Sequence, residues 1–264
     1  MTLPVRAVRG LLALLLVAVG ASCAAGPSGA PTDRAADGSP SGEITVLAAA
    51  SLTETFGTLG RDFEAGHPGT RITFSFGSSA TLAAQITAGA PADVFAAANE
   101  TTMRTVAAAG LAEDPRPFVT NTLQIAVPAG NPAEVTGLAD FADPARRIAL
   151  CAPEVPCGSA AQQVFRAAGV TPRPDTLEAD VKAALQKVRL GEVDAALVYR
   201  TDVIAAGGEV DGIDFAEAAE AVNVYPIATL RDARNPELAT AFVSYVHGPQ
   251  GRSVLADAGF APPS

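Results

Sequence analysis

The sequence predicts an α/β fold of two lobes, each built on a mainly parallel sheet with helices on both faces. Short apolar segments of strand length alternate with helical segments along most of the chain. That alternation is typical of parallel sheets whose strands are joined by helices. Hydrophobic residues make up 48% of the chain and aromatic residues only 5%, which suits closely packed α/β layers better than an aromatic-rich β-sandwich. So many strand–helix units within 264 residues indicate two lobes.

The first residues have the features of an export signal. Two arginines precede an apolar run over residues 11–19, which is too short to span a bilayer comfortably. Residues 20–23 resemble a lipoprotein cleavage box, in which the cysteine is lipidated and becomes the mature N-terminus. We therefore expect a signal peptide over residues 1–22 and a lipid anchor at Cys23, with the protein attached to the cell membrane on its extracytoplasmic side. The alternative is a secreted protein with an incidental cysteine, because Gly20 stands where the box usually has Leu, Val or Ile.

The next segment has the composition of a linker. Residues 24–42 are rich in Ala, Gly, Pro, Ser and Asp and show no apolar periodicity. Such a segment does not bury enough apolar surface to order itself. We expect a flexible tether over residues 23–42, and the folded part then begins near residue 43.

The charge of the chain limits its partners. The formal net charge is −10, and no basic cluster or aromatic–basic interleaving occurs. Nucleic acid is therefore not an expected partner. An acidic chain is also a poor trap for an anion if charged side chains do the binding, so an anion site here has to depend on neutral donors.

Three strand–helix units open the folded part. The apolar runs predict strands over residues 44–49, 71–76 and 93–96. Helical patterns that run to, or stop at, a glycine predict helices over residues 51–66, 81–88 and 101–110.

The alternation continues to the end of the chain. It predicts strands over residues 123–127, 148–151, 195–199 and 222–230. It also predicts helices over residues 160–168, 179–190, 236–247 and 249–258.

Two crossings of the chain between lobes follow from this order. We place them near residues 121–127 and 222–227, which gives a first lobe of residues 43–122 and 228–264 and a second lobe of residues 123–227. Two lobes joined in this way form a cleft, the usual place for a small ligand.

Four predicted helices begin with similar local chemistry, in which small residues and serines follow a strand. A helix N-terminus leaves its first N–H groups unpaired and carries partial positive charge. Such N–H groups and serine hydroxyls hold an oxyanion without a formal positive charge. Taken singly, Ser51 and Ser79 are better explained as helix caps than as ligand-binding residues, and Tyr199 as a residue of the core or of the lobe surface. Their occurrence at several strand ends, where open α/β sheets bind ligands, favours a site.

The same segments resemble a known family. Residues 46–53 (VLAAASLT), 76–82 (FGSSATL) and 89–95 (GAPADVF) are similar to periplasmic molybdate-binding proteins of ABC transporters. Further matching stretches follow in the expected order at residues 154–158 (EVPCG), 180–181 (DV), 197–199 (LVY) and 248–250 (GPQ). Each stretch alone is weak, but the ordered set is specific and extends over nearly all of the folded part.

The resemblance implies a type II periplasmic-binding fold with an oxyanion held between the lobes. The ligand-binding residues that it implies are Ser51, Ser79, Cys157, Val181 and Tyr199, with Ser78 as an additional candidate. The serines would donate hydroxyl and backbone N–H groups, Cys157 and Val181 backbone N–H groups, and Tyr199 its phenolic hydroxyl. The position of Cys157 is usually a small residue such as alanine. No cofactor is expected, and molybdate would be held through its oxygens without direct metal ligands.

Cys151 and Cys157 are the remaining cysteines. In an exported protein two nearby cysteines favour a disulfide, and this one would stiffen the loop that carries the Cys157 N–H group. A thiol redox pair or a soft-metal site is the alternative, although the spacing is not Cys-x-x-Cys.

These observations leave three function classes. The first is a monomeric solute-binding protein that captures molybdate or tungstate for the membrane permease of an ABC transporter. The second keeps the fold but binds sulfate, phosphate or an organic acid. The third is an enzyme, such as a thiol-dependent one that uses Cys151 and Cys157, but the sequence has no nearby His–Asp constellation and no Gly-x-Ser-x-Gly motif.

Overall fold

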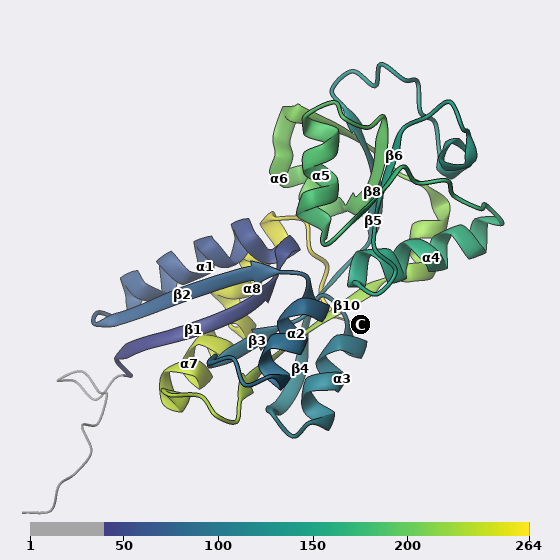
Figure 1. The fold of residues 1–264 in the computed structure, drawn as a ribbon. Helices are drawn as coiled ribbons and strands as arrows, with labels where there is room; N and C mark the ends of the chain where they lie inside the picture. Colours follow the sequence, from purple (N-terminus) through teal and green to yellow (C-terminus); the bar gives the residue numbers. More distant parts are fainter. Residues whose placement is uncertain (1–39, 264) are drawn as a thin grey trace, which may run out of the picture. The chain divides into compact units, whose positions relative to one another are not determined.

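A computed structural model of the protein describes residues 40–263, which contain two five-stranded sheets with their own helices (Figure 1). The strand order is β2-β1-β3-β10-β4 in the first sheet and β7-β6-β8-β5-β9 in the second. The predicted signal peptide, the lipid anchor at Cys23 and nearly all of the predicted tether lie outside the described residues. No helix within the described part is long and apolar enough to cross a membrane.

The first lobe contains both ends of the described chain. Its strands are β1 (Gly42–Ala49), β2 (Thr70–Gly77), β3 (Val94–Ala96), β4 (Ala112–Asn121) and β10 (Asn223–Leu230). Its helices are η1 (Ala50–Leu52), α1 (Thr53–Gly66), α2 (Ser79–Thr87), α3 (Glu100–Ala108), α7 (Pro236–His247) and α8 (Pro249–Asp257).

The second lobe is formed by the middle of the chain. Its strands are β5 (Leu123–Pro128), β6 (Ile148–Cys151), β7 (Thr176–Glu178), β8 (Ala195–Tyr199) and β9 (Val210–Ile213). Its helical segments are η2 (Leu138–Ala142), α4 (Pro156–Ala168), α5 (Val181–Arg189), α6 (Arg200–Ala206), η3 (Gly207–Glu209) and η4 (Ala216–Ala221).

The two-lobed α/β fold is confirmed, but the sheets are mixed and not mainly parallel. In the first sheet β1 pairs in parallel with β2 and β3, whereas β10 pairs antiparallel with β3 and β4. In the second sheet β6 pairs in parallel with β7 and β8, whereas β5 pairs antiparallel with β8 and β9. The antiparallel pairings involve the strands next to the crossings, because the chain enters and leaves the second lobe in opposite directions.

The crossings between the lobes are short. Only Thr122 separates β4 from β5, and only Val222 separates η4 from β10. Residues 223–227 pair with β4 of the first sheet, so the expectation that placed them in the second lobe is wrong. The first residue of β10, Asn223, already pairs with Asn121 of β4.

The core of the first lobe explains how its helices are positioned. On α1, Phe56, Leu59 and Phe63 recur at helical spacing and are buried, which gives the helix one apolar face. The ring of Phe56 packs against Phe118 of β4 and Phe242 of α7. The start of α1, which follows the predicted Ser51 site, is therefore anchored on the first sheet.

Candidate functional site

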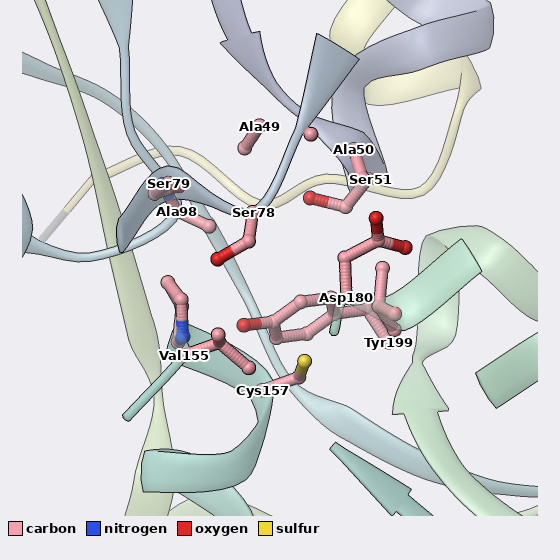
Figure 2. A pocket seen from close by; sticks show the side chains of 13 residues that line it. Ala49, Ala50, Ser51, Ser78, Ser79, Ala98, Val155, Cys157, Asp180 and Tyr199 are labelled. Atoms are coloured by element: carbon pink, nitrogen blue, oxygen red, sulfur yellow. The ribbon is translucent and has the colours of Figure 1, made fainter. Parts of the chain in front are cut away.

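A small cavity lies between the two lobes and is lined by segments from both (Figure 2). Its volume is about 20 Å³, slightly more than one water molecule requires by the same kind of measure. All of the sequence-predicted ligand-binding residues line it: Ser51, Ser78, Ser79, Cys157, Val181 and Tyr199. This volume suits a small inorganic ion better than an amino acid or a sugar.

The parallel pairing of β1 and β2 brings the serines of the first lobe together. Ala49 at the end of β1 is in register with Gly77 at the end of β2. Ser51 and Ser79 each follow these paired residues by two positions, and both are buried. The carboxyl ends of adjacent parallel strands thus deliver both serines to one wall of the cavity.

The second lobe builds the opposite wall in the same way. β7, β6 and β8 are neighbours in that order and run parallel. Cys157 follows the end of β6, Val181 follows the end of β7, and Tyr199 is the last residue of β8. The sequence prediction began α4 at residue 160, but the helix begins at Pro156, because proline fits the first helical position. Cys157 therefore lies in the first turn of a helix.

The helix starts at the cavity have few side-chain caps. No side chain caps η1, α2 or α4. At α5 the carboxylate of Asp180 accepts a hydrogen bond from the Ala183 N–H group at 3.0 Å, which leaves the N–H group of Val181 uncapped. Unpaired N–H groups and the positive ends of the helix dipoles make these starts suitable for an anion.

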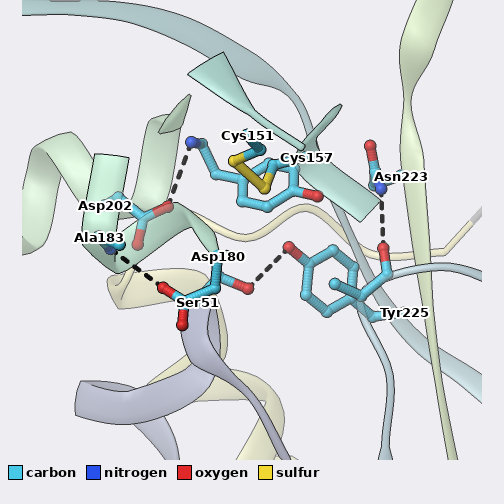
Figure 3. The surroundings of a disulfide bond; sticks show 10 residues. Ser51, Cys151, Cys157, Asp180, Ala183, Asp202, Asn223 and Tyr225 are labelled. Atoms are coloured by element: carbon cyan, nitrogen blue, oxygen red, sulfur yellow. Dashed lines mark hydrogen bonds between the residues drawn. A yellow bond between two sulfur atoms is a disulfide. The ribbon is translucent and has the colours of Figure 1, made fainter. Parts of the chain in front are cut away.

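Two serine hydroxyls are oriented by hydrogen bonds within the protein. The oxygen of Ser79 accepts a hydrogen bond from the Ala98 N–H group at 2.9 Å, so its own proton is available to another acceptor. Ser51 Oγ lies 2.9 Å from the hydroxyl of Tyr225 (Figure 3). Burial raises the pKa of Tyr225, so both hydroxyls carry a proton and either one can donate in this contact. When the Tyr225 hydroxyl donates, the proton of Ser51 is available to another acceptor.

Two other hydroxyls in the cavity have no partner. The oxygens of Ser78 and Tyr199 are buried without a hydrogen bond in the described part of the chain, and their residues are 6% and 1% exposed. Burial, with Tyr225 and Asp202 nearby, raises the pKa of Tyr199 well above its usual value, so this hydroxyl is a donor. An unsatisfied buried hydroxyl costs about 1–3 kcal/mol. Two of them in one cavity are donors that a bound polar group, either a ligand or a water molecule, would satisfy.

The charges at the cavity agree with a site made of neutral donors. Of the described residues that line it, none is Lys or Arg, and Asp180 is the one with an ionisable carboxyl group. In the absence of a cationic side chain in this lining, the helix starts are the source of positive charge for an anion. No group of three or more potential metal-ligating side chains occurs within residues 40–263.

A disulfide joins Cys151 at the end of β6 to Cys157 in the first turn of α4 (Figure 3). Both sulfurs are in this bond, which leaves neither cysteine as a free thiol for catalysis. A Cβ atom on Gly158 would overlap the carbonyl oxygen of Ala152. Glycine at this position therefore permits the close approach between the start of α4 and the backbone after β6.

Sequence reasoning missed Tyr225, Ala98 and Asp202. Ala98 contributes a backbone N–H group, and an alanine carries no signal of that role. Tyr225 lies on β10, and its contact with Ser51 exists only because β10 returns to the first sheet. The carboxylate of Asp202 accepts a hydrogen bond from the Tyr199 N–H group at 3.1 Å; its position three residues after Tyr199 was the one available signal.

Comparison with known proteins places this geometry in a family. The family model described as bacterial extracellular solute-binding protein matches residues 44–261. Molybdate-binding protein ModA of Mycobacterium tuberculosis is 42% identical over 257 residues, which are 97% of this chain and 96% of that protein.

Solved structures share the fold. The periplasmic molybdate-binding protein of Azotobacter vinelandii has a TM-score of 0.73 and 22% identity, over 84% of this chain and all of that chain. The sulfate-binding protein SubI of Mycobacterium tuberculosis has a TM-score of 0.72 and 20% identity, over 83% of this chain and 86% of that chain. At such identities these likenesses show the fold alone. The match over residues 44–261 shows more: the chain belongs to the bacterial extracellular solute-binding protein family and is a solute-binding protein, not an enzyme.

Proposed function

We propose that the protein is the molybdate-binding component of an ABC transporter and holds molybdate or tungstate in the cavity between its lobes. The observation that carries the proposal is the pair of buried, unpartnered hydroxyls of Ser78 and Tyr199 beside uncapped helix starts. The 42% identity to a molybdate-binding protein over nearly the whole chain supports the choice of ion.

The proposed ligand contacts divide the donors between the two walls. Ser51 and Ser79 donate hydroxyl and N–H groups, Cys157 and Val181 donate N–H groups, and Tyr199 donates its hydroxyl. Ser78 is an additional donor, because its hydroxyl is also buried and without a partner. Neutral donors in a site closed to water hold a doubly charged anion well, because each hydrogen bond is charge-assisted. We expect sub-micromolar affinity, about −8 kcal/mol or better.

The second candidate is another tetrahedral oxyanion. Sulfate has the charge and shape of molybdate and is smaller, so donors spaced for molybdate hold it poorly. A sulfate-binding protein shares the fold, so sulfate is the alternative ligand to test. Molybdate and tungstate are similar in size and charge, and we expect both to bind.

We propose that two lobes, residues 43–122 with 223–264 and residues 123–222, close over the ligand by a hinge movement. The short crossings at Thr122 and Val222 support this proposal. We also propose a signal peptide over residues 1–22, a tether over residues 23–42 and lipidation at Cys23, which would hold the protein near its permease. Mass spectrometry of the mature N-terminus tests the anchor, and an unmodified cysteine there would remove it.

Calorimetric titration of the purified protein with four ions tests the proposed ligand. Molybdate and tungstate should bind in the sub-micromolar range, and sulfate and phosphate at least ten-fold more weakly, a difference of about 1.4 kcal/mol. Equally tight binding of sulfate or phosphate would contradict the choice of ion. Absence of binding by all four would contradict an oxyanion site.

A further inference from the structure

We propose that Glu54, Lys182 and Asp202 form an electrostatic latch that holds the two lobes closed over the bound oxyanion. The latch rests on the proposed function, because it acts by stabilising the closed, ligand-bound form.

The geometry of the latch joins the two lobes through one lysine. The Nζ atom of Lys182 lies 2.7 Å from Glu54 Oε2 and 3.0 Å from Asp202 Oδ1. Glu54 is on α1 of the first lobe, whereas Lys182 and Asp202 are on α5 and α6 of the second. One of the two contacts therefore crosses the cleft, and the other stays within a lobe.

The burial of the three side chains gives each a different role. Asp202 is fully buried, Lys182 is 24% exposed and Glu54 is 53% exposed. Removing a buried carboxylate from its cation is costly, so Lys182 stays with Asp202 whether the lobes are open or closed. Glu54 is the member that water can solvate when the lobes separate. The contact between Glu54 and Lys182 is thus the one that forms on closing and breaks on opening.

Lys182 is a cation in this setting. Burial alone would lower the pKa of Lys182, but the charges and hydrogen bonds of Asp202 and Glu54 outweigh burial and raise it. The ion pair across the cleft is therefore present at neutral pH.

The latch is connected directly to the ligand-binding segments. Glu54 follows Ser51 by three residues, and Lys182 follows Val181 by one. Asp202 also accepts a hydrogen bond from the Tyr199 N–H group at 3.1 Å. Closing the pair therefore brings the starts of η1 and α5 together around the cavity, and the same buried carboxylate fixes the strand end that carries the Tyr199 hydroxyl.

Removing the charge of Glu54 tests the proposal, because the two explanations predict opposite changes in ligand affinity. Glu54 is an acid near a site for a dianion, so simple repulsion predicts that its removal strengthens binding. The latch predicts that its removal weakens binding, because the closed form loses an ion pair. Since Glu54 is half exposed, the expected loss is about two- to five-fold in affinity.

The experiment compares Glu54→Gln with Glu192→Gln in the full chain. Glu192 pairs with Lys187 at 2.6 Å within the second lobe and is 46% exposed, so both variants remove one negative charge and one exposed ion pair. Molybdate affinity is measured by calorimetry, and the release rate by stopped-flow chase with excess tungstate. Glu54→Gln should bind two- to five-fold more weakly with a correspondingly faster release, and Glu192→Gln should match the wild type. In about 0.5 M salt the difference between Glu54→Gln and the wild type should shrink, because salt screens the exposed pair.

The outcomes separate the latch from the proposed function. A wild type that binds molybdate, together with a Glu54→Gln variant that binds as tightly or more tightly, overturns the latch and leaves the proposed function intact. If Glu192→Gln weakens molybdate binding as much as Glu54→Gln does, the latch is also overturned, because the loss of affinity would then come from the change in net charge. A wild type that binds no molybdate overturns both. Glu54 is chosen over Lys182 because Lys182→Met would leave Asp202 buried without its cation and would disturb folding.

Discussion

The two walls of the cavity differ in the hydrogen-bond donors that they offer to the proposed oxyanion. The first lobe offers the side-chain hydroxyls of Ser51, Ser78 and Ser79, whereas the second offers mainly backbone N–H groups, at Cys157 and Val181, with the hydroxyl of Tyr199. The proposed contacts therefore depend on the identity of the side chain on the first wall and, apart from Tyr199, on the position of the backbone on the second.

The two walls are also held in place by different means. In the first lobe, hydrogen bonds with the Ala98 N–H group and with the Tyr225 hydroxyl orient two serine hydroxyls. In the second lobe, a disulfide fixes the start of α4 and Asp180 caps the start of α5. The comparison implies that serine-to-alanine variants probe the first wall, whereas the second wall needs variants that change the backbone.

The largest effect is expected from removing a backbone donor of the second wall. Val181→Pro deletes the N–H group at the first position of α5, where proline is well tolerated, and the extended conformation of Asp180 suits a following proline. We expect molybdate affinity to fall about 100-fold, or about 3 kcal/mol, because a charged oxygen loses its donor. Val181→Ala keeps the N–H group and should bind within a few-fold of the wild type. Similar calorimetric affinities for the two variants would show that this N–H group does not contact the ligand.

A smaller effect is expected from each serine of the first wall. Ser51→Ala and Ser79→Ala should each weaken molybdate binding by about 2 kcal/mol, or about 30-fold, through loss of one hydroxyl donor. Ser159→Ala, on α4 and outside the cavity lining, is the control and should bind normally in the same titration. Unchanged affinity in both Ser51→Ala and Ser79→Ala would remove these hydroxyls from the site and leave the first wall without its assigned role.

The smallest effect on binding is expected from the disulfide. The Cys151→Ser, Cys157→Ser double variant keeps the Cys157-position N–H group but loosens the start of α4, so affinity should fall only two- to three-fold. Its free energy of unfolding in urea should fall by about 2 kcal/mol, as expected for a short loop. Reductant should affect the wild type in the same way and leave the double variant unchanged. A double variant as stable as the oxidised wild type would show that the bond does not stabilise this wall.

The difference between the walls also explains which site residues could be predicted from the sequence. Ser51 and Ser79 follow apolar strands, and their hydroxyl groups can be recognised from the sequence as possible hydrogen-bond donors. Cys157 and Val181 are proposed to act through their backbone N–H groups, so nothing in their side chains indicates a ligand, and their assignment depended on resemblance to a family. Tyr225 could not be found, because its contact with Ser51 depends on where β10 returns.

Among the elements, edge strands were the hardest to predict. β4 was missed because it contains Pro115 and Pro117 together with charged residues, a composition that usually marks a loop. It is tolerated because β4 lies at the edge of the first sheet, where proline need not donate to a neighbour. The short edge strands β7 and β9 were missed as well. The central strands β6 and β8 were predicted at their observed bounds, because both are wholly buried and continuously apolar.

The neighbouring positions of the two crossings limit how one lobe can move relative to the other. Asn121, at the end of β4, pairs in register with Asn223, at the start of β10, so both connections leave the first lobe from one hydrogen-bonded ladder. Because both connections start from neighbouring positions, we expect rotation about a line through them to be the easiest movement of one lobe relative to the other. A transporter that touches both lobes would therefore sense one angle, and that angle would report occupancy without reporting which ion is inside.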